Sequence, residues 1–325
     1  MSAAMWGRWN RQRGRMILPT RMGVMSLLLV IPLALLLIQL MFTRDDELAM
    51  VERKLRAVQD IRTLQAVADN AERLRDFSII SVYQRSDATS CEYAAQRDIL
   101  RRSIEELRQD QSLREHNPII ELTIPRLLHR LDRLRPTLGT EVNTPDMAFA
   151  EHQPLVESLQ QLQFRLADQG GMFNDPDQLS MMLVYIALDE SGELFTLLGR
   201  ARAFGSLYLR MGHVPSDGVV TMEQIYERLT SQQTALQERI QRLRKDNPSL
   251  REVPLFSRHD GLRLDQVADY LDEHVIQAPD LELPWRTYFD TVSQHIVQFA
   301  VARDQMLGYL ASLYQTERAA LVRQQ

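Results

Sequence analysis

The sequence predicts an all-α protein in which one N-terminal transmembrane helix is followed by two four-helix-bundle modules that share long helices. Three observations lead to this fold class. An uncharged run lies near the start of the chain, apolar residues beyond it recur at three- and four-residue steps, and two short motifs repeat about 130 residues apart. Glycine is sparse and alternating β-branched runs are missing, so the pattern favours helices over strands.

Residues 23–42 form a run of twenty residues without a charge, GVMSLLLVIPLALLLIQLMF. At about 1.5 Å per residue, a helix of this length spans roughly 30 Å, the thickness of the hydrocarbon core of a bilayer. Five arginines and no acidic residue precede the run: Arg8, Arg11, Arg13, Arg15 and Arg21. The positive-inside rule therefore predicts that residues 1–22 form a cytoplasmic tail and that the rest of the chain is exported.

A cleaved secretory signal peptide is the alternative interpretation of this segment. The apolar part of a signal peptide usually runs for about 7–15 residues and ends in a small-residue cleavage site. Here the run is longer and ends in Gln39, Leu40, Met41 and Phe42. We therefore expect residues 23–42 to remain as an anchor in the lipid bilayer.

Composition limits what the exported part does. From residue 23 onward, 33 basic residues stand against 43 acidic residues, a formal charge of −10. This acidic balance argues against nucleic acid or an anionic membrane surface as the main partner. Cys91 is the only cysteine, so an internal disulfide and a cysteine-based zinc site are both excluded.

Proline, glycine and asparagine mark where the helices should end. They predict eight helices after the anchor, at 44–86, 91–116, 119–135, 147–168, 177–211, 221–246, 262–276 and 284–323. We assign residues 43–170 to the first bundle module and residues 171–325 to the second, since each then holds four helices with short connections.

The last helix carries a heptad repeat. One row of the repeat steps by seven from Trp285 to Ala320, and a second row runs from Phe289 to Glu317 with Arg303 as a polar member. The helix that leaves the membrane has a similar apolar face as far as about Tyr83. We expect these two long helices, the first and the last, to lie side by side.

Two motifs recur in the same order. Arg73-Leu74-Arg75-Asp76-Phe77-Ser78 is echoed by Arg200-Ala201-Arg202-Ala203-Phe204-Gly205, and Leu113-Arg114-Glu115-His116-Asn117-Pro118 by Leu243-Arg244-Lys245-Asp246-Asn247-Pro248. The similar spacing predicts a duplicated unit of about 130 residues. Chance similarity among arginine-rich helices is the alternative.

A basic N-terminus, one transmembrane helix, a long helical region and a final helix that opens with PWRTYFDTVSQHI resemble the periplasmic input region of bacterial transmembrane receptors. Chemoreceptors, diguanylate cyclases and sensor kinases carry such regions, and the nitrate-sensing and helical bimodular kinds are double four-helix bundles. The resemblance covers about residues 16–325. It implies a ligand-sensing region in the bacterial inner membrane, with the bulk of the chain in the periplasm. It also implies a homodimer, with an output domain that these residues do not include.

The resemblance also implies a ligand. In nitrate-sensing relatives, arginines on bundle helices bind a small anion, and the matching positions here are Arg73, Arg75, Arg200 and Arg202. Arginine suits this role because its planar group presents a fixed fork of donors. Arg200 and Arg202 fall on opposite sides of their helix, so one helix cannot direct both inward. We expect Arg73 and Arg200, each four residues before a phenylalanine, to have the partly buried role. Arginines that lie at the bundle edge and pair with surface acids are the alternative.

The sequence predicts no enzyme, no cofactor and no metal site. A Gly-rich phosphate loop, a G-x-S-x-G elbow and an H-E-x-x-H helix are all missing. His259, Asp260, Asp272 and His274 are the best metal-ligand candidates, and solvated helix faces explain them better. Carboxylate pairs such as Glu105-Glu106 are ordinary on an acidic surface.

A membrane-tethered helical scaffold that binds another envelope protein is the competing functional interpretation. The heptad face of the last helix runs almost to residue 325, and such a face serves a partner or a second copy as well as its own bundle.

Overall fold

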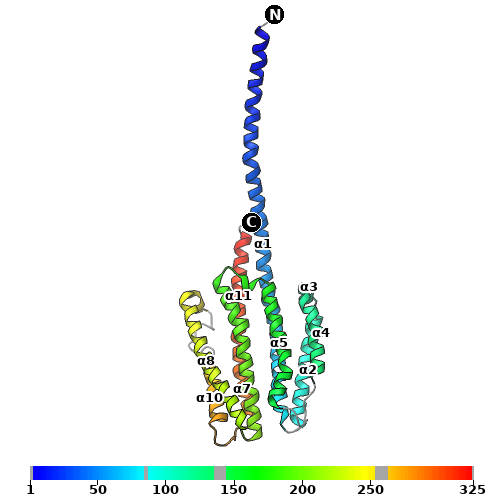
Figure 1. The fold of residues 1–325 in the computed structure, drawn as a ribbon, viewed down its shortest axis with the longest axis vertical. Helices are drawn as coiled ribbons and strands as arrows, with labels where there is room; N and C mark the ends of the chain where they lie inside the picture. The colour runs from blue at the N-terminus through cyan, green and yellow to red at the C-terminus, as the bar shows by residue number, and fades with distance from the viewer. Residues whose placement is uncertain (1–2, 84–86, 135–143, 253–262, 324–325) are drawn as a thin grey trace. The chain divides into compact units, whose positions relative to one another are not determined.

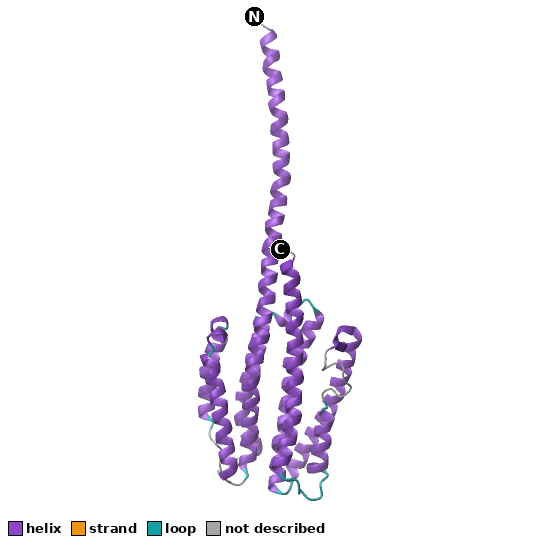
Figure 2. Cartoon of the chain, turned by 180° about the vertical axis from the view of Figure 1, so that it is seen from behind, coloured by secondary structure: helices purple, strands orange, loops and turns teal. Residues whose placement is uncertain are grey.

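A computed structural model describes residues 3–83, 87–134, 144–252 and 263–323, and these residues contain helices and no strand (Figures 1 and 2). The predicted all-α fold class is therefore confirmed. The α-helices are α1 Ala3–Val82, α2 Asp87–Gln109, α3 Gln111–His116, α4 Pro118–Arg133, α5 Pro145–Gln169, α6 Gln178–Tyr185, α7 Ser191–Met211, α8 Ser216–Asp246, α10 Leu264–Leu271 and α11 Trp285–Arg323. Short 3-10 or π turns lie at Met172–Asn174, Ile186–Glu190, Pro248–Glu252 and Asp272–Ile276.

Most boundaries agree with the predicted ranges to within a few residues, and two predicted helices are interrupted. The predicted helix 91–116 divides into α2 and α3 because the side chain of Asp110 accepts a hydrogen bond from the backbone N–H of Leu113 and caps a new helix. The predicted helix 177–211 contains a π turn at Ile186–Glu190 between α6 and α7. Residues 23–42 and the predicted helix that begins at residue 44 belong to one helix, α1, which ends at Val82; residues 84–86 lie outside the described part of the chain.

The chain divides into two compact units. The smaller unit comprises Met1–Glu52 with Glu317–Gln325, and the larger comprises Arg53–Thr316. The predicted module boundary between residues 170 and 171 falls inside the larger unit, where α5 ends at Gln169. The division into two modules stays a prediction.

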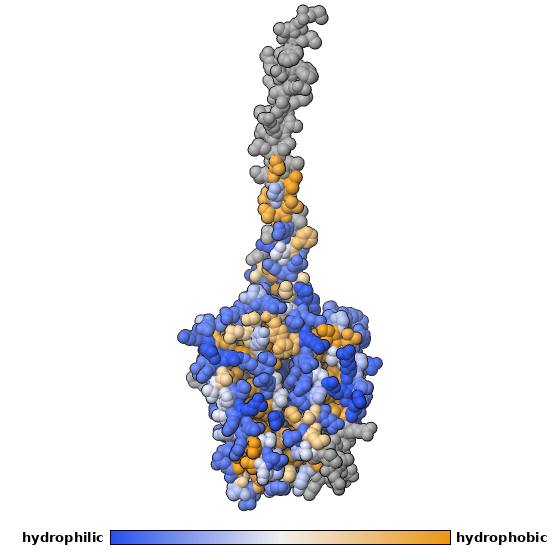
Figure 3. Space-filling view, viewed as in Figure 1, coloured by the Kyte–Doolittle hydropathy of each residue, from blue (hydrophilic) through white to orange (hydrophobic). Residues whose placement is uncertain are grey.

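In the smaller unit, the described side chains of the uncharged run are exposed. Between 49% and 67% of the surface of six apolar side chains is accessible, those of Leu28, Val30, Ile31, Leu33, Leu35 and Leu36. Figure 3 shows these residues as an apolar section of α1. Within the part of the chain that the structure describes, no helix combines the length and the apolarity needed to cross a membrane.

In the larger unit, α2 and α5 pack against α4, while α7, α8 and α10 pack against one another (Figure 1). One apolar cluster of buried side chains joins α7, α8, α10 and α11 and includes Ile79 of α1 and Ala148 of α5. A second set of fully buried side chains comes from α1, α2, α4 and α5: Ile61, Leu64, Leu100, Ile104, Ile124, Leu127, Leu131, Leu155 and Leu159.

The first and last helices lie side by side within the larger unit, as expected. Arg62 of α1 donates two hydrogen bonds to the carboxylate of Asp304 on α11, at 2.6 and 2.8 Å. The rings of Phe77 and Phe289 stack with their centroids 4.9 Å apart. The heptad face of α11 is buried at Phe289, Val292, Ile296, Phe299, Arg303, Met306 and Leu310.

The second repeated motif has the same local conformation in both copies. Asn117 ends α3 with φ −135° and ψ 85°, and Asn247 ends α8 with φ −129° and ψ 87°. Each asparagine side chain donates to the carbonyl oxygen four residues earlier, that of Leu113 or Leu243. The two motifs therefore end their helices in the same way, and duplication of a unit of about 130 residues stays a prediction.

Candidate functional site

The first repeated motif brings charged side chains into the interior where α1, α7 and α11 meet. Close approach of these helices depends on two glycines of α7. A Cβ atom at Gly205 would lie 2.6 Å from the ring of Tyr288 on α11, and one at Gly199 would lie 2.2 Å from Nη2 of Arg75 on α1. Both distances are too short for a side chain, so glycine permits the packing.

Asp76 is the centre of this cluster. Its side chain is fully buried, and Oδ2 accepts hydrogen bonds from Nε and Nη2 of Arg202 at 2.9 and 2.6 Å. Oδ1 accepts a third, at 3.2 Å, from Nε of Arg75. Nη1 of Arg202 donates to Oγ of Ser293 at 3.0 Å. One carboxylate and one guanidinium thus connect α1, α7 and α11.

Arg75 is also fully buried and contacts a fourth helix. Its Nη1 donates to Oε1 of Gln153 on α5 at 2.8 Å, and its guanidinium lies over the ring of Phe149, 4.8 Å from the centroid. Its Nη2, which faces Gly199, makes no hydrogen bond within the described residues. A buried donor without a partner lowers the stability of the fold. The contacts of Arg75 with Asp76, Gln153 and Phe149 must therefore hold the side chain in this position.

Further along α1, a second charged group lies against α11. Arg303 is buried over the ring of Phe195, 4.2 Å from the centroid, and its Nη2 donates to Asp69 at 3.2 Å. Burial raises the pKa of Glu72 to about 7, although the nearby Arg75 and Arg303 oppose the shift. Burial likewise raises the pKa of Asp69 against the opposing charge of Arg303. The cluster therefore contains three arginines and three acids, with Glu72 poised to exchange a proton near neutral pH.

Of the two arginines expected to be partly buried, Arg200 is and Arg73 is not. Arg75 and Arg202 are the buried pair, and Arg73 is exposed. Arg200 is half-buried between the rings of Phe149 and Phe204, and burial lowers its pKa. The expectation for Arg73 was wrong because α1 presents Arg75 and Asp76 to α5, α7 and α11. On α7, Arg202 is buried and Arg200 is half-buried, so the two arginines that were expected on opposite sides of this helix differ in burial.

The contacts of Arg202 with Asp76 and Ser293 are typical of a structural connection between helices rather than of an open anion-binding site. All donors of Arg202 that the structure describes are directed at Asp76 and Ser293, and Asp76 already supplies the negative charge. Arg200, in contrast, lines a cavity of about 420 Å³ together with Gln153 and Arg228. Anion binding by Arg73, Arg75, Arg200 or Arg202 stays a prediction.

Sequence reasoning missed the partners of the arginines. Asp76 stands inside the first motif and Arg303 inside the heptad face, so both were visible as polar residues at positions where apolar side chains were expected. The sequence does not single out Gln153 or Ser293 as partners of the arginines, because their roles depend on how α5 and α11 pack.

For metal sites, the described residues contain no group of three or more potential ligands. Of the metal-ligand candidates, His259 and Asp260 lie outside the described residues. Asp272 accepts a hydrogen bond from Gln277, and His274 packs edge-on against Tyr270. The chain matches no protein-family model, no curated protein and no solved structure.

Proposed function

We propose that this chain is the membrane-anchored, ligand-sensing input region of a bacterial signalling system. In this proposal residues 23–42 cross the inner membrane and residues 1–22 are cytoplasmic. Residues 43–170 and 171–325 form two periplasmic four-helix-bundle modules. A ligand that binds one arrangement of the bundle more tightly shifts the first helix against the last by about 1–2 Å. We propose no catalytic activity and no cofactor.

The buried link through Asp76 is the observation that carries this proposal. It joins α1 to α7 through Arg202, and Arg202 in turn reaches α11 at Ser293. Buried ion pairs add little net stability, but they favour particular helix registers because a displaced partner leaves an unpaired charge. A link of this kind suits an element with two discrete arrangements, which is what a sensory bundle needs.

Helix α1 supports the proposed route for the signal. The same helix that contains the uncharged run also contains Asp76. Apolar surface exposed along residues 28–36 is typical of a membrane or protein contact. The packing of α2, α4 and α5, and of α7, α8 and α10, supports two modules, each completed by one long helix.

The single cysteine offers a direct test of the membrane arrangement. Cys91 is exposed on α2. We expect a membrane-impermeant maleimide to label it in intact spheroplasts of a bacterium that expresses the full chain. The matched control is a Cys91→Ser, Ser2→Cys chain, which should react only after the inner membrane is permeabilised. Labelling of Cys91 only after permeabilisation would refute the proposed export.

A tethered scaffold that recognises another envelope protein is the second candidate, and one observation favours it. Val297 and Val301 lie one turn apart on α11, and 58% and 51% of their surfaces are exposed. This apolar strip suits a partner helix or a second copy of the chain. A mass that rises with concentration would support the homodimer that both candidates allow.

A further inference from the structure

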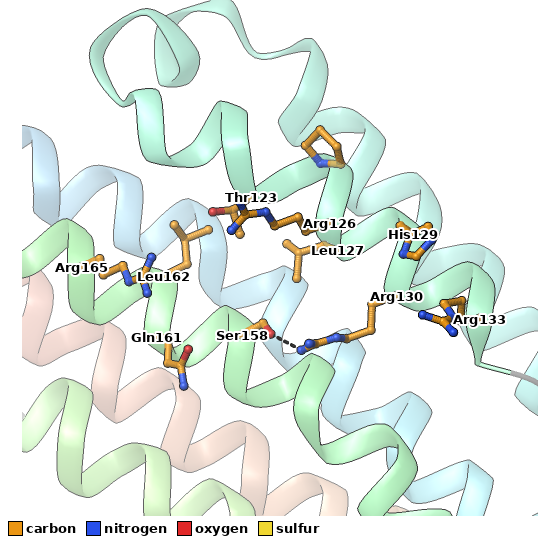
Figure 4. A pocket seen from close by; sticks show the side chains of 11 residues that line it. Thr123, Arg126, Leu127, His129, Arg130, Arg133, Ser158, Gln161, Leu162 and Arg165 are labelled. Carbon is orange, nitrogen blue, oxygen red and sulfur yellow. Dashed lines mark hydrogen bonds between the residues drawn. The ribbon is translucent and has the colours of Figure 1, made fainter.

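A cavity of about 590 Å³ lies between α4 and α5, away from the Asp76 cluster (Figure 4). Four arginines line it: Arg126, Arg130 and Arg133 from α4, and Arg165 from α5. No aspartate or glutamate is among the described residues that line it. Because the exported part of the chain is acidic, this groove is a positive region on a negative protein.

The arginines follow one face of α4. Their spacing of four and then three residues places successive side chains about one helical turn apart. Figure 4 shows Arg126 and Arg165 extending from opposite helices into the space between them. Arg130 crosses to α5, where Nη1 donates to Oγ of Ser158 and to the carbonyl oxygen of Pro154.

The other three arginines have no carboxylate partner in the part of the chain that the structure describes. Within the described residues, Arg126, Arg133 and Arg165 make no ion pair, whereas Arg62, Arg101, Arg114, Arg202, Arg263, Arg303 and Arg318 each contact a carboxylate. Like charges one turn apart on a helix repel each other. An external anion would relieve this repulsion.

The shape of the groove limits the class of anion. Its volume lies in the range of small-molecule sites. Pro125, Leu127 and Leu162 supply an apolar wall, and Thr123 and Gln161 supply neutral hydrogen-bonding groups. A single nitrate would engage one or two guanidinium groups and leave the others facing one another. We propose that the groove binds a small anion with two or more carboxylate or phosphate groups.

This inference names the class of ligand for the proposed sensory role, and its biological meaning rests on that role. The test is isothermal titration calorimetry of the full chain in mild detergent. Citrate, pyrophosphate and acetate are compared at constant ionic strength, because salt screens the attraction between an anion and exposed arginine side chains. We expect citrate or pyrophosphate to bind at least tenfold more tightly than acetate.

Variants identify the site. Arg126→Gln combined with Arg165→Gln should weaken binding of the multivalent anion at least tenfold while leaving the melting temperature without anion unchanged, since both side chains are exposed. Arg102→Gln removes an exposed charge from α2, outside the groove, and should leave the affinity unchanged.

Two results would overturn the inference. One is that neither citrate nor pyrophosphate binds. The other is that Arg102→Gln weakens binding as much as the double variant in the groove does, which would mean that the anion responds to the overall charge of the protein. Neither result decides whether the chain is a sensory region, because the topology of Cys91 and the movement of α1 against α11 are measured separately.

Discussion

At the scale of single residues, Asp76 accepts three hydrogen bonds from two arginines in an interior that water does not reach. Removing one member of a buried ion pair leaves the other charge without compensation. Because the two arginines come from different helices, the carboxylate sets the position of α7 against α1.

The first prediction concerns this carboxylate. Asp76→Asn keeps the size of the side chain but removes its charge, so it should lower the free energy of unfolding by about 3–5 kcal/mol. Chemical denaturation of the full chain measures the change. Asp304→Asn is the matched control, since its ion pair with Arg62 is exposed and should contribute at most about 1 kcal/mol. Equal losses in the two variants would argue against a special role for Asp76.

Gly199 provides a second prediction. In Gly199→Ala the new methyl group would lie 2.2 Å from Nη2 of Arg75, so the guanidinium must move and stability should fall by about 1–3 kcal/mol. Gly308→Ala is the control, because a Cβ there meets nothing within 4 Å. That variant should gain up to about 1 kcal/mol from the higher helix propensity of alanine. A stabilised Gly199→Ala protein would show that Arg75 does not need its observed position.

The raised pKa of Glu72 predicts that the free energy of unfolding depends on pH. Its pKa rises from an ordinary 4.5 to about 7 in the folded protein, so the folded state holds a proton that the unfolded state releases. The stability that this proton contributes is present below about pH 4.5 and is lost as the pH rises through 7. Relative to wild type, Glu72→Gln should therefore become progressively more stable between pH 5 and pH 8.

The comparison between variants is necessary because other groups titrate nearby. Burial lowers the pKa of His152 to about 4, which makes stability rise with pH over an overlapping range. Glu227→Gln, an exposed change on α8, controls for the loss of one negative charge. A difference between Glu72→Gln and wild type that is constant with pH would mean that Glu72 is ionised throughout.

At the scale of helices, sequence periodicity was sufficient for the long elements. The heptad in α11 and the apolar face of α1 predicted their lengths and their pairing because each helix buries one continuous stripe. The break at Asp110 was missed because Asp110 caps a helix that continues in nearly the same pattern.

The choice between Arg73 and Arg75 could not be made from periodicity. The end of α1 is buried on several sides, at Leu74, Arg75, Asp76, Ser78, Ile79 and Ile80, so no single stripe identifies its inner face there. Which arginine is buried depends on α5 and α7, which approach α1 from positions that the sequence pattern does not specify. The basic row of α4 was not predicted, because its significance depends on the cavity that α4 forms with α5.

The buried and exposed faces of α11 give a fourth prediction. Phe299 is 6% exposed and belongs to the apolar cluster of α7, α8, α10 and α11, so Phe299→Ala should lower the free energy of unfolding by about 3–5 kcal/mol. Val297→Ala, two residues earlier on the exposed face, should change it by less than about 0.5 kcal/mol. Denaturant titration distinguishes the two. Similar losses at both positions would mean that the exposed face of α11 is covered by a further partner.

At the scale of the whole molecule, buried charged side chains join the first and last helices of the larger unit. In the proposed function, residues 23–42 would fix the location of the chain and the groove between α4 and α5 would bind a multivalent anion. The Asp76 cluster would then provide a connection that resists intermediate positions. A scaffold needs only the first of these features.

The most direct test is therefore the movement of α1 against α11. Arg62→Cys and Asp304→Cys are introduced into a Cys91→Ser chain, and the rate of cross-linking by a short thiol-reactive reagent is measured in membranes with and without citrate, pyrophosphate or nitrate. A Gln294→Cys, Gln298→Cys pair within α11 is the control and should be insensitive to anions. We predict that an anion that binds the chain changes the rate between α1 and α11. An unchanged rate in the presence of every anion that binds would contradict the sensory account and favour the scaffold.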